Sequence, residues 1–254
     1  MAYQPLGAIS GSPRPRIRVP ILEQLVGVVG DQRGEDAANR LCEACLALFD
    51  VDAAAICLVV GGAHAATLGA SGPTARVLDE LQFTLGEGPA LDAVTRRAAM
   101  LVTDLAEAGG TYRWPTYRHA MGVHGIRFVY AIPIAIVGHF IGALTLFRAH
   151  PGMLSVRQFA GARLAAELAE MPILDLAKAD LQAAVAEPDN HSWTELTTLT
   201  RTEVNQATGM LVTQLNIEPA VALVRLRAHA YATDRTPTDV ARDILAHRLQ
   251  LQAN

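Results

Sequence analysis

The sequence predicts an α+β protein, in which an antiparallel-sheet domain is followed by a helical connector and an all-α bundle of three helices. Two patterns predict this fold. Before residue 150, short apolar runs end at glycines, which is typical of antiparallel strands and their turns. After residue 191, apolar residues recur at steps of three and four, as in amphipathic helices. A chain of 254 residues is long enough for two such domains.

The N-terminal part reads as a tail followed by helices and a strand pair. Residues 1–18 are basic and rich in proline, so we expect a disordered tail there. The wholly apolar run at 53–60 ends at Gly61-Gly62, which favours a hairpin turn. The elements expected in this part are helices at 20–29, 35–49 and 74–83, and strands at 53–60 and 64–71.

A glycine-rich loop, Leu85 to Pro89, opens the second half of this domain, and its carboxylate, Glu87, has no partner that the sequence can assign. Ser155 is expected to open a long helix, which Met171-Pro172 interrupts because proline removes a helix hydrogen bond. The other elements expected here are a short helix from Pro89, strands at 100–103, 128–137 and 139–148, a helix at 114–124 and a helical connector from 173 to 185.

Residues 187–191 form the clearest linker, so the connector and linker together span 173–191 and the bundle spans 192–254. Three helix starts follow. Ser192-Trp-Thr-Glu195 has the form of a capping box, and Pro219 and Thr236-Pro-Thr-Asp239 carry N-terminal signals. We expect Asn216 to stop the first helix and the third to continue through Leu251.

Charge and cysteine content exclude several classes of protein. The net charge is −4, so bulk charge does not favour a polyanion partner, but every basic residue from 192 to 254 is an arginine. Arginine is the better planar donor to phosphates and base edges, although a solvated helix surface explains the pattern as well. Cys42, Cys45 and Cys57 are interpreted as buried core residues, because a four-cysteine metal site lacks its second pair; redox sensing and metal ligation stay open.

The sequence lacks the marks of a membrane or secreted protein. The longest apolar stretch, Val129 to Leu146, is broken by Pro133 and by glycines, so we expect no membrane span. The N-terminus has no apolar segment before a cleavage site, and we therefore expect a cytoplasmic protein.

Residues 20–172 resemble a GAF domain, a family of sensor domains. Three phrases and the helix after Ser155 carry the resemblance: LGEGPALDAV, MLVTDL and RWPTYRHAMGVHGIRFVYAIPIAIVGHFIGALTLF. GAF-like domains share a fold but bind varied ligands, so the ligand must be argued from the site. The apolar and aromatic residues that we predict to line a ligand pocket are Leu68, Leu85, Trp114, Tyr117, Phe128 and Tyr130; core packing explains them equally well.

The segment from Arg201 to Leu245 resembles an ANTAR domain. The phrases that carry the resemblance are Gln206-Ala207, Gly209-Met210-Leu211, Leu226-Arg227 and Asp239-Val240-Ala241. The sequence departs from the family at Thr208, where the family often has lysine, and this weakens one expected phosphate contact. The resemblance implies a dimeric protein that binds paired RNA stem-loops and prevents transcription termination.

Arg227 is the leading candidate for RNA contact. It follows Leu226, so if Leu226 is buried Arg227 lies at the edge of the bundle, where it can stack on a base or pair with phosphate. A surface arginine without a partner is the competing interpretation, and the small residues Ala207 and Gly209 also fit a role in close helix packing. The full set predicted to bind RNA is Arg201, Gln206, Thr208, Gly209, Arg227, Arg235 and Thr236.

These observations predict a signal-responsive, RNA-binding antitermination regulator that acts as a homodimer, with an unidentified small molecule or upstream protein at the GAF-like domain. The alternative is a sensor whose helical C-terminal domain binds a protein partner. An enzyme is the weakest hypothesis, because the sequence has neither a nucleophile elbow nor a phosphate-binding loop. No metal or cofactor is predicted, since His119, His124 and the other histidines do not pair at helical ligand spacing.

Overall fold

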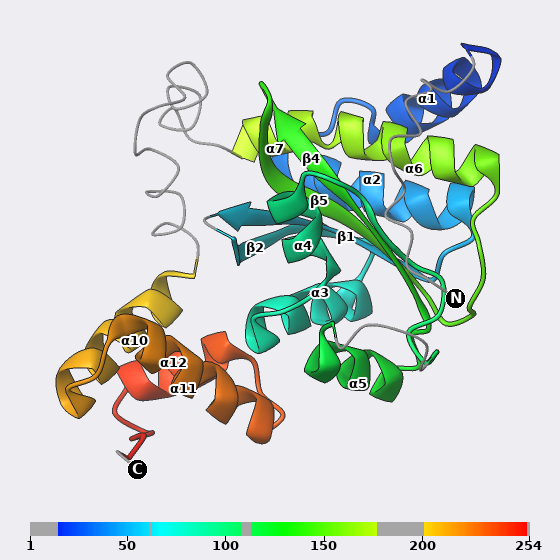
Figure 1. Cartoon of the computed structure of the whole chain (residues 1–254). Coiled ribbons are helices and arrows are strands. Elements are labelled where there is room, and N and C mark those ends of the chain that lie inside the picture. The colour runs from blue at the N-terminus through cyan, green and yellow to red at the C-terminus, as the bar shows by residue number, and fades with distance from the viewer. Residues whose placement is uncertain (1–14, 61, 108–112, 177–200, 253–254) are drawn as a thin grey trace.

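The computed structural model describes residues 15–60, 62–107, 113–176 and 201–252. Within these residues an antiparallel sheet lies between two layers of helices, and three further helices form a bundle beside it (Figure 1). We call residues 15–176 the sheet domain and residues 201–252 the bundle. The protein therefore has the predicted α+β fold.

The sheet has five strands in the order β2-β1-β5-β4-β3, and all neighbouring strands are antiparallel. The hairpin between β4 and β5 turns at Val137-Gly138, where both residues have positive φ, as tight hairpin turns require. The strands are β1 (Ala53–Val60), β2 (Ala63–Ala70), β3 (Met100–Val102), β4 (Phe128–Ile136) and β5 (His139–Arg148).

Helices cover both faces of this sheet, and the alternation of side chains along β4 shows which face is which. Phe128 and Tyr130 belong to the core beneath the first two and the last two helices of the sheet domain. Val129 belongs to the core on the opposite face. The first face is covered by α1 (Pro15–Val29), α2 (Gly34–Phe49), α6 (Val156–Leu168) and α7 (Glu170–Leu176). The second is covered by α3 (Pro73–Leu85), α4 (Pro89–Arg96) and α5 (Pro115–Val123).

The helix boundaries follow local chemistry. Ser155 caps α6 through a capping box, in which its side chain accepts from Gln158 N at 3.2 Å and the Gln158 side chain accepts from Ser155 N at 2.8 Å. The break between α6 and α7 falls at Ala169, because Pro172 has no N–H to donate back to Leu168. At the other end of the domain α1 begins at Pro15, earlier than the expected residue 20, since a missing N–H is no loss at the first helical position.

The glycine-rich loop joins three helices. Gly86 caps α3 with φ +69°, and a Cβ atom at Gly88 would collide with the side chain of Gln82. Glu87 between them accepts hydrogen bonds from the first backbone N–H groups of α5, Thr116 at 2.8 Å and Tyr117 at 2.9 Å. The carboxylate that the sequence could not assign therefore satisfies the N-terminus of a helix distant in the chain.

The bundle consists of α10 (Thr202–Leu215), α11 (Pro219–Ala232) and α12 (Pro237–Leu245). Two predicted boundaries are confirmed: Asn216 ends α10 in the left-handed conformation, and the side chain of Thr236 accepts from Asp239 N at 3.1 Å. Leu251, expected within the third helix, lies beyond its end and packs against the bundle core. The core is formed by Val204, Ala207, Leu211, Ala222, Leu226, Ala230, Val240, Ala241 and Ile244.

Some predictions lie outside the described residues: the tail at 1–14, the connector beyond 176, the linker at 187–191 and the capping box from Ser192 to Glu195. The three cysteines are buried and free, which confirms the core interpretation of their position. In the described part of the chain no single helix is long and apolar enough to cross a membrane; α10 and α11 reach that length and composition only as a pair bent by 111°.

Candidate functional site

The bundle lies beside α3 of the sheet domain (Figure 1). Phe83, near the C-terminal end of α3, makes the contact. The Phe83 side chain is only 4% exposed, and it packs with the core of the bundle rather than with the cores beside the sheet. Two guanidinium groups of the bundle lie over its ring: Cζ of Arg201 is 3.7 Å and Cζ of Arg227 is 4.2 Å from the ring centroid. Both distances are those of cation–π contacts.

Arg201 makes three further contacts with the sheet domain. Its Nη1 lies 2.8 Å from Oε2 of Glu80, its Nε donates to the carbonyl of Ala65 at 2.7 Å, and its Nη2 lies 3.4 Å from Nδ1 of His64. The side chain is 10% exposed, so this ion pair is largely shielded from water. Such a pair is stronger than one on the open surface, because solvent screens it less.

A buried carboxylate, Asp79, lies behind this contact. Its Oδ2 is 2.8 Å from Nε2 of His64 and accepts from the Thr67 hydroxyl at 2.6 Å. Because a guanidinium can only donate, the contact with Arg201 assigns the proton of a neutral His64 ring to Nε2, which then donates to Asp79. Burial raises the pKa of Asp79, but the interactions with His64, Thr67 and Arg201 outweigh it and lower the pKa below its usual value.

Cys57 completes a group of possible metal ligands with His64 and Asp79, whose ligand atoms all lie within 4.8 Å of one another. The donors present do not favour an ion there. Asp79 already accepts from three side chains, Gln82 being the third at 3.2 Å, and burial raises the pKa of the Cys57 thiol. The cluster is better described as a closed hydrogen-bond network. Sequence spacing could not reveal it, because its members lie on β1, β2 and α3.

Arg227 is held less completely than Arg201. Its Nε is buried without a hydrogen-bond partner among the described residues. Burial and then the charge of Arg201 lower the pKa of Arg227 to about 10. We call the arrangement in which the bundle contacts α3 through Phe83 the docked conformation. It leaves a donor of Arg227 unsatisfied and places the cations Arg201 and Arg227 side by side.

The other residues predicted to contact RNA lie elsewhere on the bundle. Gln206 and Gly209 are exposed on α10, and a side chain at Gly209 would meet open space, so this glycine has no packing role in the structure. The Thr208 hydroxyl donates to the carbonyl of Val204 at 2.7 Å. Arg235 pairs with Asp243 at 2.6 Å, close to the α12 cap at Thr236. The structure thus brings Arg201 and Arg227 together and leaves the remaining five outside their contact.

A cavity of about 830 Å³ separates the two domains beside this contact. Residues of α3 and α5 line one wall, and the end of α11 and the start of α12 line the other. Among the residues on its walls are Arg76, Glu80, His124, Tyr231, Arg235 and Thr236.

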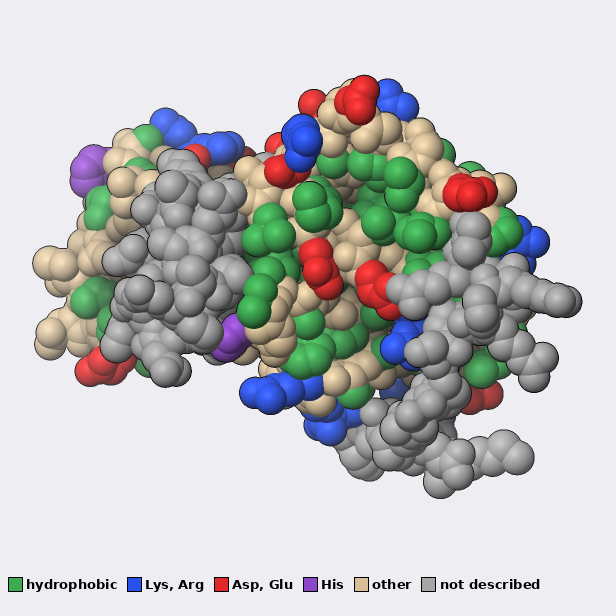
Figure 2. All heavy atoms as spheres, turned by 90° about the horizontal axis from the view of Figure 1, so that it is seen from above, with side chains coloured by type: hydrophobic (Ala, Val, Ile, Leu, Met, Phe, Trp, Pro, Cys, Tyr) green, Lys and Arg blue, Asp and Glu red, His purple; other side chains and the backbone are tan. Residues whose placement is uncertain are grey.

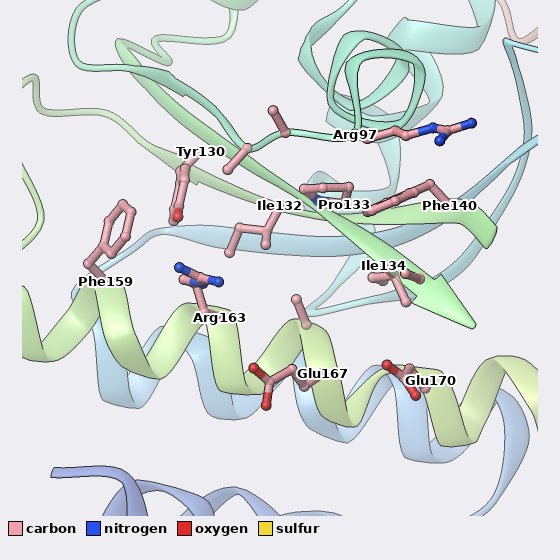
Figure 3. A pocket seen from close by; sticks show the side chains of 14 residues that line it. Arg97, Tyr130, Ile132, Pro133, Ile134, Phe140, Phe159, Arg163, Glu167 and Glu170 are labelled. Atoms are coloured by element: carbon pink, nitrogen blue, oxygen red, sulfur yellow. The ribbon is translucent and has the colours of Figure 1, made fainter. Parts of the chain in front are cut away.

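A second cavity, of about 580 Å³, lies inside the sheet domain between β4 and α6. Figure 3 shows Tyr130 and Phe159 at one end with Arg163 beside them, and Glu167 and Glu170 further along the helices. The two rings stack with centroids 5.1 Å apart, and the buried Tyr130 hydroxyl has no partner among the described residues. Figure 2 views the molecule from the side of α6 and α7, where hydrophobic side chains gather with acidic ones among them.

The structure does not bring the predicted pocket residues together. Tyr130 lines the cavity between β4 and α6, and Phe128 and Leu68 pack with the core on that side of the sheet. The other three, Leu85, Trp114 and Tyr117, pack with the core on the opposite side. The sequence had no means of separating them, because residues far apart in the chain show their face only once the strands are paired. Phe159 and Arg163 of α6, which line the same cavity as Tyr130, are not among the residues predicted from the sequence.

The chain thus has an α+β domain in contact with a small helical domain, and each matches a family of regulatory domains. Residues 33–172 match the family model of the GAF domain, and residues 196–245 match that of the ANTAR domain. The chain belongs to the GAF domain family and carries a C-terminal ANTAR domain, as the resemblance predicted.

Several solved structures are similar to part of this chain. The GAF domain of a phosphoenolpyruvate-protein phosphotransferase from Coxiella burnetii is 19% identical, with 60% of this chain and 92% of that chain covered and a TM-score of 0.44. The structure of fRMsr of Staphylococcus aureus is 13% identical, with 63% of this chain and 94% of that chain covered and a TM-score of 0.44. The chromophore-binding domain of a Stigmatella aurantiaca bacteriophytochrome is 9% identical, with 67% of this chain and 63% of that chain covered and a TM-score of 0.44. Likeness this distant does not indicate what the present chain binds. No curated protein matches it.

Proposed function

We propose that this protein is a signal-responsive RNA-binding regulator of transcription antitermination, in which the GAF domain is the sensor and the ANTAR domain binds RNA stem-loops. The observation that supports it best is the arginine pair over Phe83. Arg201 and Arg227 lie over a planar ring at 3.7 and 4.2 Å, and arginine side chains also stack on the planar bases of unpaired RNA.

The chemistry of the two arginines fits RNA better than it fits catalysis. Guanidinium groups donate to phosphate oxygens and stack on bases, and they remain charged at neutral pH. Of the acidic groups near them, Glu80 is paired with Arg201, and Asp79 is occupied by hydrogen bonds within a closed network. We therefore propose that the protein is not an enzyme and that its output is nucleic-acid binding.

The test is the affinity of the full-length protein for an RNA with two stem-loops, measured over a range of salt concentrations. We expect the logarithm of affinity to fall with the logarithm of salt, with a slope of about −0.7 to −0.9 for each phosphate neutralised. Arg227→Ala should weaken binding by about tenfold, the usual scale of one stacked base. Arg242→Ala is the matched control, because this exposed arginine of α12 pairs with Glu203 and Asp239.

If the wild type, Arg227→Ala and Arg242→Ala bind RNA equally strongly, Arg227 does not contact the RNA. If neither the wild type nor a variant with the arginines released bound RNA, the alternative would be favoured, in which the helical domain binds a protein partner. The released variant is Phe83→Ala, described below.

We further propose that the cavity between β4 and α6 receives the signal and takes a planar aromatic molecule with an acidic group. The stacked rings of Tyr130 and Phe159 offer an apolar wall. Arg163 and the Tyr130 hydroxyl, which has no partner among the described residues, offer donors at the same end. A set of aromatic carboxylates should include one that raises the melting temperature of the wild type and leaves Tyr130→Phe unchanged. Equal shifts in both proteins would argue against this site.

A homodimer is part of the proposal, because two bundles at a fixed spacing can hold two stem-loops at once and gain effective concentration. The helices that follow the sheet expose apolar side chains, among them Val156 and Met171 at 80% and 54%. Light scattering across a range of concentrations, with and without RNA, tests this step. A monomer under every condition would contradict it.

A further inference from the structure

We infer that the C-terminal end of α3 imitates a nucleotide and competes with RNA for Arg201 and Arg227, so that the docked conformation is a silent state of the regulator. The inference rests on the proposed function. Phe83 supplies a planar ring to the two guanidinium groups, as a base would, and Glu80 supplies oxygens to Arg201 at 2.8 Å, as a phosphate would. Both substitutes come from one helix of the sensor domain.

The docked contact and an RNA contact exclude each other. Arg201 is 10% exposed, Arg227 is partly buried and Phe83 is 4% exposed, so the ring occupies the place beside both guanidinium groups. A base cannot take that place until Phe83 leaves. The affinity for RNA is then reduced by the fraction of molecules that are docked.

The side chain of Phe83 packs in the core of the bundle and not in the cores of the sheet domain, to which the residue belongs. It packs with the core that Leu226 and Ala230 help to form, and it belongs to none of the clusters beside the sheet. If the domains separated, a large aromatic side chain would become exposed on α3. An aromatic residue in this position indicates a contact surface, not an element of the sheet domain's own core.

The contact is also incomplete in a way that favours exchange. The Nε of Arg227 is buried without a partner among the described residues, and the charge of Arg201 lies beside it. An unsatisfied buried donor destabilises the docked state, whereas a phosphate supplies acceptor oxygens and negative charge. RNA can therefore satisfy Arg227 where α3 does not, which makes replacement of α3 by RNA favourable.

The test compares full-length variants of α3 that leave both arginines in place. Phe83→Ala removes the ring, Phe83→Leu keeps most of the apolar volume without an aromatic face, and Glu80→Gln removes the charge that pairs with Arg201. We expect Phe83→Ala to bind the two-stem-loop RNA about tenfold more tightly than the wild type, with smaller gains for the other two. Glu43→Gln, an exposed position on α2, is the control for the loss of a carboxylate and should leave the affinity unchanged.

Two outcomes would overturn the inference, and each can be told apart from failure of the proposed function. If the wild type and Phe83→Ala bind equally and both lose binding on Arg227→Ala, the ANTAR domain binds RNA and α3 does not compete. If Phe83→Ala binds more weakly although its melting curve shows a folded protein, Phe83 supports RNA binding instead of blocking it. If neither protein binds RNA at any salt concentration, the proposed function itself fails.

Discussion

Arg201 and Asp79 show how single residues join the two domains. Arg201 reaches from the start of α10 to Glu80 and His64, and Asp79 fixes His64 from behind. The carboxylate is buried, which raises its pKa, yet interactions with His64, Thr67 and Arg201 of the other domain lower the pKa below its usual value. A substitution at Asp79 should therefore alter both the stability of the sheet domain and its contact with the bundle.

The pH dependence of stability tests this residue. The pKa of Asp79 is lowered in the folded protein, so its ionised form stabilises the fold above the unfolded value of about 3.9, and this contribution is lost as the pH falls through the lower, folded pKa. The difference in the free energy of unfolding between wild type and Asp79→Asn should be larger at neutral pH than in acid. Urea titrations at several pH values measure it, and a difference independent of pH would contradict the assignment.

Removal of the Tyr130 hydroxyl, in contrast, is expected not to destabilise the protein. Its hydroxyl is buried without a partner among the described residues, and a buried hydroxyl without a hydrogen bond destabilises a fold by about 1 kcal/mol or more. Tyr130→Phe should consequently leave the melting temperature unchanged or raise it. A clear loss of stability would mean that the hydroxyl has a bonded partner, such as an ordered water, in the folded protein.

At the scale of elements, Glu87 connects the loop after α3 to the N-terminus of α5. Its carboxylate accepts from two backbone N–H groups that otherwise have no helical partner. Glu87→Ala should lower the free energy of unfolding by about 1 kcal/mol, as the loss of a helix cap does. Thermal unfolding measures the change, with Glu43→Ala as the exposed control; equal effects of both substitutions would contradict a capping role.

The elements were largely predictable because their signals are local. Prolines mark the first residues of α3, α4 and α5, Gly86 ends α3, Asn216 ends α10, and the Thr236 side chain caps the start of α12. The site was less predictable, because Phe83, Arg201 and Arg227 meet only after the two domains are in contact. The same limit applies to the cluster of Cys57, His64 and Asp79, and to the faces on which the predicted pocket residues lie.

At the scale of the whole molecule, one helix serves two domains. The inner face of α3 packs on the sheet through Leu78, while Phe83 and Glu80 meet the bundle. A signal that moves α3 relative to the sheet would therefore also change the contact with Arg201 and Arg227. The cavity of about 830 Å³ beside this contact leaves room for such a displacement.

The most direct test of the account is amide hydrogen exchange in the full-length protein with and without the two-stem-loop RNA. The account predicts opposite changes in two neighbouring elements: α11, which carries Arg227, becomes more protected, while the end of α3 around Phe83 becomes less protected as it is displaced. Increased protection of both elements, or protection of α11 with no change in α3, would show that RNA binds while the domains stay docked and would contradict the competition between them.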